Sequence, residues 1–191
     1  NELNHRVKNT LATVQSIAFQ SLKHARTVEH AQESFESRLM ALSRVHDVLT
    51  QESWESADLR IIVHQAVSPF EGIGLQRFVL SGPPIRLPPR QVLPLSMAFH
   101  ELLTNALKYG ALSVPAGWVS IAWSVAADGR TLALRWEEND GPTVRRPTEL
   151  GFGTRLIRRG LAQELDGEVD ILFDPSGVIC AITIPLPARC G

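Results

Sequence analysis

The sequence predicts an α+β protein, in which an N-terminal helical hairpin precedes helices packed on one face of a mixed β-sheet. Two observations predict this fold class. The first 50 residues contain no Pro or Gly and carry apolar residues at helical spacing. The later residues place helices and β-hairpins in separate blocks of the chain, as α+β layers do. We expect the hairpin to cover residues 1–55 and a second unit to cover residues 56–191.

Each expected hairpin helix carries one apolar stripe. In the first helix its members recur every three or four residues: Leu3, Val7, Leu11, Val14, Ala18 and Leu22. After a polar break at residues 24–27, a second stripe comprises Phe35, Leu39, Leu42, His46 and Leu49. Because two helices alone bury little surface, we expect the pair to form a four-helix bundle as a dimer or to pack on the rest of the chain.

The second unit reads as alternating helices and strands. Asp58 is a suitable N-cap for the first helix of this unit, and Asp128-Gly129 is a strong signal for a β-hairpin turn. Helices are expected at residues 59–67, 91–108 and 154–165. Strands are expected at residues 77–80, 119–125, 131–136, 169–173 and 178–184.

Composition excludes several function classes. The net charge of −1 gives no electrostatic basis for binding a nucleic-acid duplex. No apolar run approaches the roughly 20 residues of a membrane-spanning helix, so we expect no membrane segment in this chain. Cys180 and Cys190 lack metal-ligand spacing and fit a reducing, cytoplasmic compartment. The chain lacks an initiator Met and opens with helical sequence, so we expect a fragment of a longer protein.

A histidine near the N-terminus is a candidate nucleophile. His5 lies about 200° around the helix from both Leu3 and Val7, so it faces away from the apolar stripe. An ordinary imidazole, with a pKa of about 6.5, is mostly neutral at pH 7 and can attack an electrophile. By itself the pattern favours a surface histidine on an amphipathic helix.

The helix expected at residues 91–108 carries a narrow polar stripe. Glu101, Asn105 and Lys108 are spaced i, i+4 and i+7 and therefore share one face. An amide oxygen can bind Mg²⁺, an ammonium group can meet phosphate charge, and a carboxylate can accept a proton. The stripe suits a magnesium–triphosphate ligand, and a solvated face with a Glu–Lys pair is the alternative.

Two glycine-containing segments follow this helix. A strand runs into residues 136–142, Trp-Glu-Glu-Asn-Asp-Gly-Pro, where an acidic side chain can accept a hydrogen bond from an adenine amino group. Residues 151–154, Gly-Phe-Gly-Thr, open a helix whose free N–H groups can bind phosphate. Either segment alone could be a turn or a cap, but their order along the chain favours a nucleotide site.

In this order the motifs resemble those of sensor histidine kinases. His5 matches the H box, residues 100–110 the N box, residues 136–142 the first glycine box and residues 151–154 the second. The match is to the HWE subfamily, whose markers correspond to His100, Trp136 and Glu138. The H box also fits the form of that subfamily, as His5-Arg6-Val7-Lys8-Asn9. The resemblance covers essentially the whole chain.

The resemblance implies a dimerisation and phosphotransfer hairpin followed by an ATP-binding α/β sandwich of the type shared with gyrase, Hsp90 and MutL. It implies that His5 accepts the phosphoryl group and that Asn105 ligates Mg²⁺. Glu138 takes the adenine-reading position, with Asp140 as a close rival. The other matched nucleotide-site positions are Lys108, Tyr109, Gly141, Gly151, Gly153 and Thr154.

Two acids are candidates for the catalytic base. Ordinary histidine kinases carry an acid directly after the phosphoacceptor, where this chain has Arg6. Glu2, one helical turn before His5, could orient the imidazole ring or simply counter the helix dipole. Glu101 could accept the proton, and also contact magnesium, when the ATP-binding unit docks on the hairpin. We favour Glu101, because its stripe also carries Asn105.

The expected activity is autophosphorylation by ATP, as a protein-histidine kinase of a two-component system. The resemblance implies transfer of the phosphate to an Asp of a response-regulator receiver domain. It also implies a homodimer formed through the hairpin and a sensory domain outside this chain. An inactive nucleotide-binding scaffold and another ATPase of the same fold are the alternatives, and the intact motifs favour the kinase.

Overall fold

The computed structural model describes residues 2–23, 25, 27–52, 54–146 and 162–187. Its first two helices, α1 (Glu2–Lys23) and α2 (Val28–Gln51), form the predicted hairpin. The hydroxyl of Thr27, the N-cap of α2, accepts a hydrogen bond of 3.2 Å from the His30 N–H and so starts the second helix after the polar break.

The apolar stripe expected on α1 is only partly buried. Ile17 packs with Ala41, Leu42 and Met97 in a small core between α1, α2 and α4. The stripe residues Val7, Leu11 and Leu22 stay 49%, 57% and 69% exposed, because α1 turns the face around Ile17 and Ser21 inward. The hairpin therefore leaves an apolar face uncovered within one chain.

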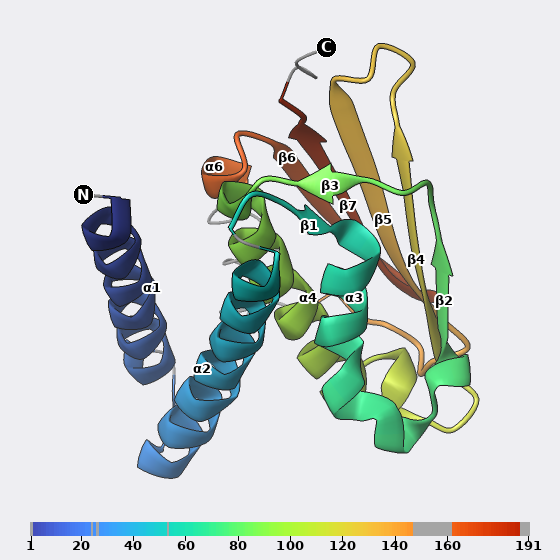
Figure 1. Cartoon of the computed structure of the whole chain (residues 1–191). Helices are drawn as coiled ribbons and strands as arrows, with labels where there is room; N and C mark the ends of the chain where they lie inside the picture. The colour runs from blue at the N-terminus through green and yellow to red at the C-terminus, as the bar shows by residue number, and fades with distance from the viewer. Residues whose placement is uncertain (1, 24, 26, 53, 147–161, 188–191) are drawn as a thin grey trace.

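The remaining chain forms one five-stranded mixed sheet and a layer of helices (Figure 1). The strand order is β2-β4-β5-β7-β6, with β2 and β4 parallel and the other neighbours antiparallel. Helices α3 and α4 cover one face of this sheet, as the sequence predicts. The elements are β1 (Ala57–Asp58), α3 (Leu59–Val67), η1 (Ser68–Ile73), η2 (Leu75–Arg77), β2 (Phe78–Ser81), β3 (Arg86–Leu87), α4 (Pro89–Lys108), η3 (Ala111–Ser113), β4 (Trp118–Val125), β5 (Thr131–Asn139), α6 (Ala162–Glu164), β6 (Glu168–Asp174) and β7 (Gly177–Pro185).

The hairpin shares its core with the sheet unit. Val45, Val48 and Leu49 of α2 belong to the main cluster of buried apolar residues, together with α3, α4 and the inner face of the sheet. Helix α2 therefore lies between α1 on one side and the pair α3 and α4 on the other (Figure 1). The boundary at residues 55 and 56 stays a prediction.

Local signals placed most elements, with one informative difference at β5. Asp58 caps α3 as expected, and its Oδ1 accepts a hydrogen bond of 2.7 Å from the Arg60 N–H. Strand β5 continues to Asn139, three residues beyond the predicted end at residue 136. It continues because β4 pairs with it to the last residue, with Trp118 opposite Asn139. Most of the helix expected at residues 154–165 lies outside the described residues.

Candidate functional site

The C-terminal end of α4 and the end of β5 meet at one corner of the sheet unit. The N-box helix ends at Lys108 and turns through Gly110 into η3. The first glycine box occupies the last residues of β5 and the turn after it, residues 136–142. Two segments some 30 residues apart in sequence thus form the corner at which the sequence predicts a nucleotide.

Glu138 is the inward-facing acid of this corner. The side chain is 4% exposed, because Glu138 continues the inward face of β5 that Leu134 and Trp136 form. Its Oε2 accepts a hydrogen bond of 2.8 Å from the Ala111 N–H, and its Oε1 accepts one of 3.4 Å from the Trp136 indole. Burial raises the pKa of Glu138, against the lowering effect of these two hydrogen bonds.

Two glycines allow the segments to approach this closely. A Cβ on Gly110 would lie 1.9 Å from Oε2 of Glu138, and a Cβ on Gly141 would lie 2.6 Å from the Cα of Ala111. Neither position has room for a larger residue. The glycine of the N box and that of the first glycine box therefore both serve the close packing of α4, η3 and β5.

Asp140, the rival acid, occupies a different environment. It is exposed, has a φ of 54°, and its Oδ2 accepts a hydrogen bond of 2.9 Å from the indole of Trp118. Asp is one of the few non-glycine residues that tolerate this left-handed conformation. Asp140 thus turns the chain out of β5, while Glu138 faces the interior.

The polar stripe of α4 divides between two environments. Asn105 is half-buried, while Lys108 and Tyr109 are exposed at the helix end, Tyr109 by 75%. Among the residues that the structure describes, neither the Asn105 amide nor the Lys108 ammonium has a hydrogen-bond or ion-pair partner. An amide oxygen and a cation near the Glu138 corner fit the magnesium and phosphate groups of a nucleotide.

Glu101 does not share this open environment. It is 6% exposed, and its Oε1 accepts a hydrogen bond of 2.7 Å from Nε of Arg38, a residue of α2. The alternative Glu–Lys pair of a solvated face does not occur between Glu101 and Lys108. The carboxylate proposed as a base is thus bound to the hairpin by a buried ion pair.

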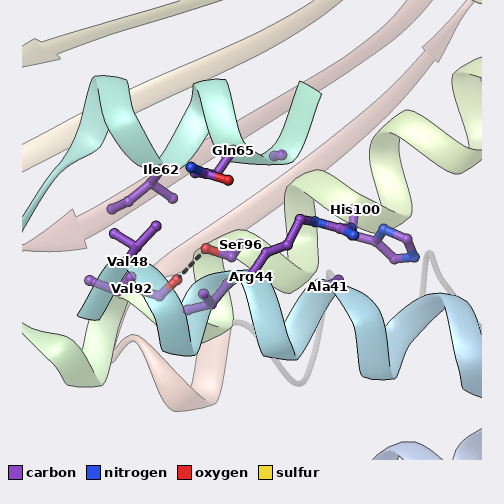
Figure 2. Close-up of a pocket in the computed structure, with 10 residues that line it drawn as sticks. Ala41, Arg44, Val48, Ile62, Gln65, Val92, Ser96 and His100 are labelled. Carbon is purple, nitrogen blue, oxygen red and sulfur yellow. Dashed lines mark hydrogen bonds between the residues drawn. The ribbon is translucent and has the colours of Figure 1, made fainter. Parts of the chain in front are cut away.

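The two other subfamily markers lie away from solvent. Trp136 is fully buried in the core of the sheet unit. His100 is 6% exposed between α2 and α4, where Figure 2 shows the Arg44 side chain extending from α2 toward its ring. Arg44 and His100 both line a cavity of about 20 Å³ between α2, α3 and α4. Burial lowers the pKa of His100, and the charges of Arg44, Arg38 and Lys108 act in the same direction, against the raising effect of Glu101.

Several residues predicted for the site lie wholly or in part outside the described structure. Gly151, Gly153 and Thr154 lie outside the described residues. Glu2 and His5 lie in the first turns of α1, but their side chains are outside the described part. Their roles stay predictions.

Arg38 is a residue of the candidate site that the sequence analysis missed. A signal was present, because Arg38 follows Phe35 by three residues and precedes Leu42 by four, which places it on the apolar face of α2. An arginine on a buried face needs an acidic partner. Its identity as Glu101, 63 residues later, could not be read from the pattern.

Two absences hold for the described part of the chain. No helix there is long and apolar enough to cross a membrane. No group of three or more His, Cys, Asp or Glu residues there could hold a metal ion.

Comparison with known proteins identifies histidine kinases as relatives of this chain. Residues 2–84 match the family model described as HWE histidine kinase. The chain is 41% identical over 187 residues to the blue-light-activated histidine kinase of Brucella ovis. The aligned region covers 97% of this chain and 38% of that protein. The chain therefore spans less than two fifths of the length of this curated relative.

Solved structures give the same fold. The blue-light activated histidine kinase EL346 of Erythrobacter litoralis superposes with a TM-score of 0.71 at 23% identity, over 98% of this chain and 59% of that chain. The separate histidine kinase domain of the same protein superposes with a TM-score of 0.63 at 18% identity, over 92% of this chain and 96% of that domain. At these identities the superpositions show a shared fold.

Proposed function

Because this chain belongs to the HWE histidine kinase family, we propose that it is the ATP-dependent, autophosphorylating core of a sensor histidine kinase. The observation that carries the proposal is the α4–β5 corner. There the buried carboxylate of Glu138 lies next to η3. Asn105 and Lys108 of α4 contribute an amide and an ammonium group, neither of which has a side-chain partner among the described residues. These are the groups that an adenine, a divalent cation and a phosphate chain require.

Glu138 is the adenine-reading acid in this proposal. Its Oε2 accepts a hydrogen bond from the Ala111 N–H, so the carboxylate is already held in place as a hydrogen-bond acceptor. The amino group of adenine is a donor, whereas guanine presents a carbonyl at the same position, which a carboxylate would repel. The corner thereby favours ATP over GTP.

His5 is the proposed phosphoacceptor. A neutral imidazole nitrogen attacks the γ-phosphorus in line, a bond forms between nitrogen and phosphorus, and ADP leaves. Lys108 offsets the charge that spreads over the phosphate oxygens. Glu101 accepts the proton that the imidazole loses, and Glu2 is the alternative residue for orienting the ring.

Magnesium fits the same corner, and Asn105 is the described residue that would hold it through its amide oxygen. The ion supplies charge neutralisation to the phosphates when it is bound. Gly141, near the end of the first glycine box, packs closely on Ala111 of η3.

A second copy of the chain is the proposed partner of the hairpin. The apolar groove between α1 and α2 has a volume of about 570 Å³. Large apolar side chains beside it and along α1 are exposed: Val7, Leu11, Phe19, Leu22 and Val28. Burying such a surface favours a four-helix bundle of two hairpins.

A response-regulator receiver domain is the proposed acceptor of the phosphate. A sensory domain outside this chain would supply the signal. The proposed compartment is the cytoplasm, where ATP is available.

Incubation with γ-labelled ATP tests the proposal. We expect the chain to acquire label that is stable in base and lost in acid, as a phosphorylated histidine is. Nucleotide binding without label would support the inactive scaffold instead. Free phosphate release without a labelled protein would support an ATPase of the same fold.

A further inference from the structure

Beside the apolar cores that they share, the hairpin and the N-box helix are joined by one buried guanidinium. Nε of Arg38 donates to Oε1 of Glu101 at 2.7 Å, and Nη1 donates to the hydroxyls of Ser21 at 2.9 Å and Ser34 at 2.6 Å. Arg38 and Glu101 are 7% and 6% exposed. Three helices, α1, α2 and α4, thus meet at one buried cation.

A second polar contact lies beside the first. The Ser37 hydroxyl and Nε2 of His100 are hydrogen-bonded at 3.1 Å. Two successive residues of α2 therefore bind two successive residues of α4, which fixes both the distance and the rotation between the helices. Removing one partner of a buried ion pair leaves the other charge without compensation. We therefore expect that substitution of either Arg38 or Glu101 disrupts this contact between α2 and α4.

The contact holds the nucleotide corner far from the acceptor histidine. Helix α1 rises about 1.5 Å per residue, so the backbone of His5 lies about 24 Å along the axis from Ser21, which is bound to the same Arg38 as Glu101.

Helix α4 runs in the same direction as α1. In the middle of α1, Thr10 and Thr13 line a groove with Arg90 and Leu93 from the start of α4, whereas Ser21, near the end of α1, is joined through Arg38 to Glu101, farther along α4. Asn105, one turn beyond Glu101, therefore lies farther still from His5. Figure 1 shows the same arrangement, with the N-terminus of α1 at the end of the hairpin opposite η3.

We propose that Arg38 is a positioning residue that latches Glu101 and α4 to the hairpin in a resting arrangement, and that this latch opens before His5 is phosphorylated. The inference rests on the proposed function, because it treats Asn105 and Glu101 as parts of the nucleotide site. Opening frees Glu101 from its cation and frees the sheet unit to move along the hairpin.

The distance between the two units tests the latch without ATP chemistry. Spin labels at Ser43 of α2 and Ser124 of β4, both exposed positions, report this distance by double electron–electron resonance. The labelled protein carries Ser43→Cys, Ser124→Cys and Cys190→Ser. Cys180 can stay, because burial raises the pKa of its thiol to about 12 and keeps it unreactive.

Arg38→Met is the main variant, because it keeps the aliphatic length and removes the charge. We expect the distance distribution to broaden and shift from that of the parent protein. The initial rate of autophosphorylation should rise about fivefold or more, as the open population grows. Ser34→Ala removes one hydroxyl partner of Arg38 without leaving a buried charge, so it tests the same latch if Arg38→Met fails to fold. It should shift both readouts in the same direction by a smaller amount.

Arg44→Met is the matched control. It removes the same charge from the same helix, where Arg44 has no ion-pair partner among the described residues. It should leave the distance distribution unchanged. An unchanged distribution in both Arg38→Met and Ser34→Ala overturns the latch, as does a shifted distribution accompanied by a lower rate. Failure of the parent protein to acquire label would overturn the proposed function instead, while the distance measurement would still decide the latch.

Discussion

Two buried glutamates lie on the helical and the sheet side of the same unit, and they are stabilised in different ways. Glu101 has a cationic partner, the guanidinium of Arg38, which belongs to the hairpin. Among the residues that the structure describes, Glu138 has two neutral donors, the Ala111 N–H and the Trp136 indole, both from its own unit. A carboxylate paired across two units can change partner when they move, whereas one held by its own fold stays oriented for a ligand.

The difference also separates the electrostatics of the two sites. Burial raises the pKa of Glu138, because the carboxylate loses the water that would stabilise its charge. A ligand that brings donor groups, as an adenine does, would lower the cost of its ionisation. Glu101, by contrast, lies beside the opposite charge of Arg38.

The largest expected effect separates the base from the latch. Glu101→Gln removes the proton acceptor but also releases Arg38, so the substitution is best made in the Arg38→Met background. There we expect the rate of autophosphorylation at saturating ATP to fall about 10²-fold or more, the usual effect of losing a general base. ATP affinity, measured by calorimetry, should change little. If Glu2→Gln lowers the rate more than Glu101→Gln, the hairpin supplies its own base.

A smaller effect is expected at the second glutamate. Glu138→Ala should weaken ATP binding by about 1–3 kcal/mol, the cost of losing a charged hydrogen-bond partner. It should also lower the melting temperature, because the buried Ala111 N–H loses its acceptor. Asp140→Ala is the comparison variant, because Asp140 is exposed and binds only the Trp118 indole among the described residues. Weakened ATP binding in Asp140→Ala with normal binding in Glu138→Ala would move the adenine-reading role by two residues.

The smallest effect concerns the histidine beside the latch. The pKa of His100 is lowered in the folded chain, so below its ordinary value of about 6.5 the unfolded chain binds a proton that the folded chain does not. Stability is therefore lost as the pH falls from 7.5 to 5.5, by up to about 1.4 kcal/mol per pH unit from this group.

His100→Gln should remove this component. Its urea-denaturation free energy should fall less over the same range than that of the parent chain. Glu138 and Glu164, whose pKa values are raised by burial, act with the opposite sign but equally in both proteins. Parallel pH curves for the two proteins would contradict the assignment.

Local chemistry was enough to predict much of the fold. The Asp58 cap, the turn at Asp128-Gly129 and the helices α2 and α4 are encoded by neighbours in sequence, and the structure confirms them. Of the apolar stripe predicted on α2, Leu42 and Leu49 are buried, whereas His46 is exposed. The end of β5 was predicted too early, because a strand of consecutive polar residues at 137–139 is favoured only when β4 pairs with it.

The site was predictable in part for the same reason. The spacing of Asn105 and Lys108 follows from helix geometry, and both lie in the last turn of α4, just before the η3 segment whose Ala111 N–H binds Glu138. The partner of Glu101 was not predictable, because helical spacing places Glu101 in line with Asn105 but does not show which neighbouring helix covers it. Only the packing of α2 on α4 reveals that Arg38 reaches it.

The central claim is that the hairpin carries the acceptor and the sheet unit carries the nucleotide. His5→Ala tests it most directly, with labelling by γ-labelled ATP and ATP affinity measured on the same preparation. We expect labelling to be lost while ATP affinity stays within about twofold of that of the parent chain, because His5 lies far from the α4–β5 corner along α1. Stable labelling of the His5→Ala chain would place the acceptor elsewhere and contradict the role of the hairpin as its carrier.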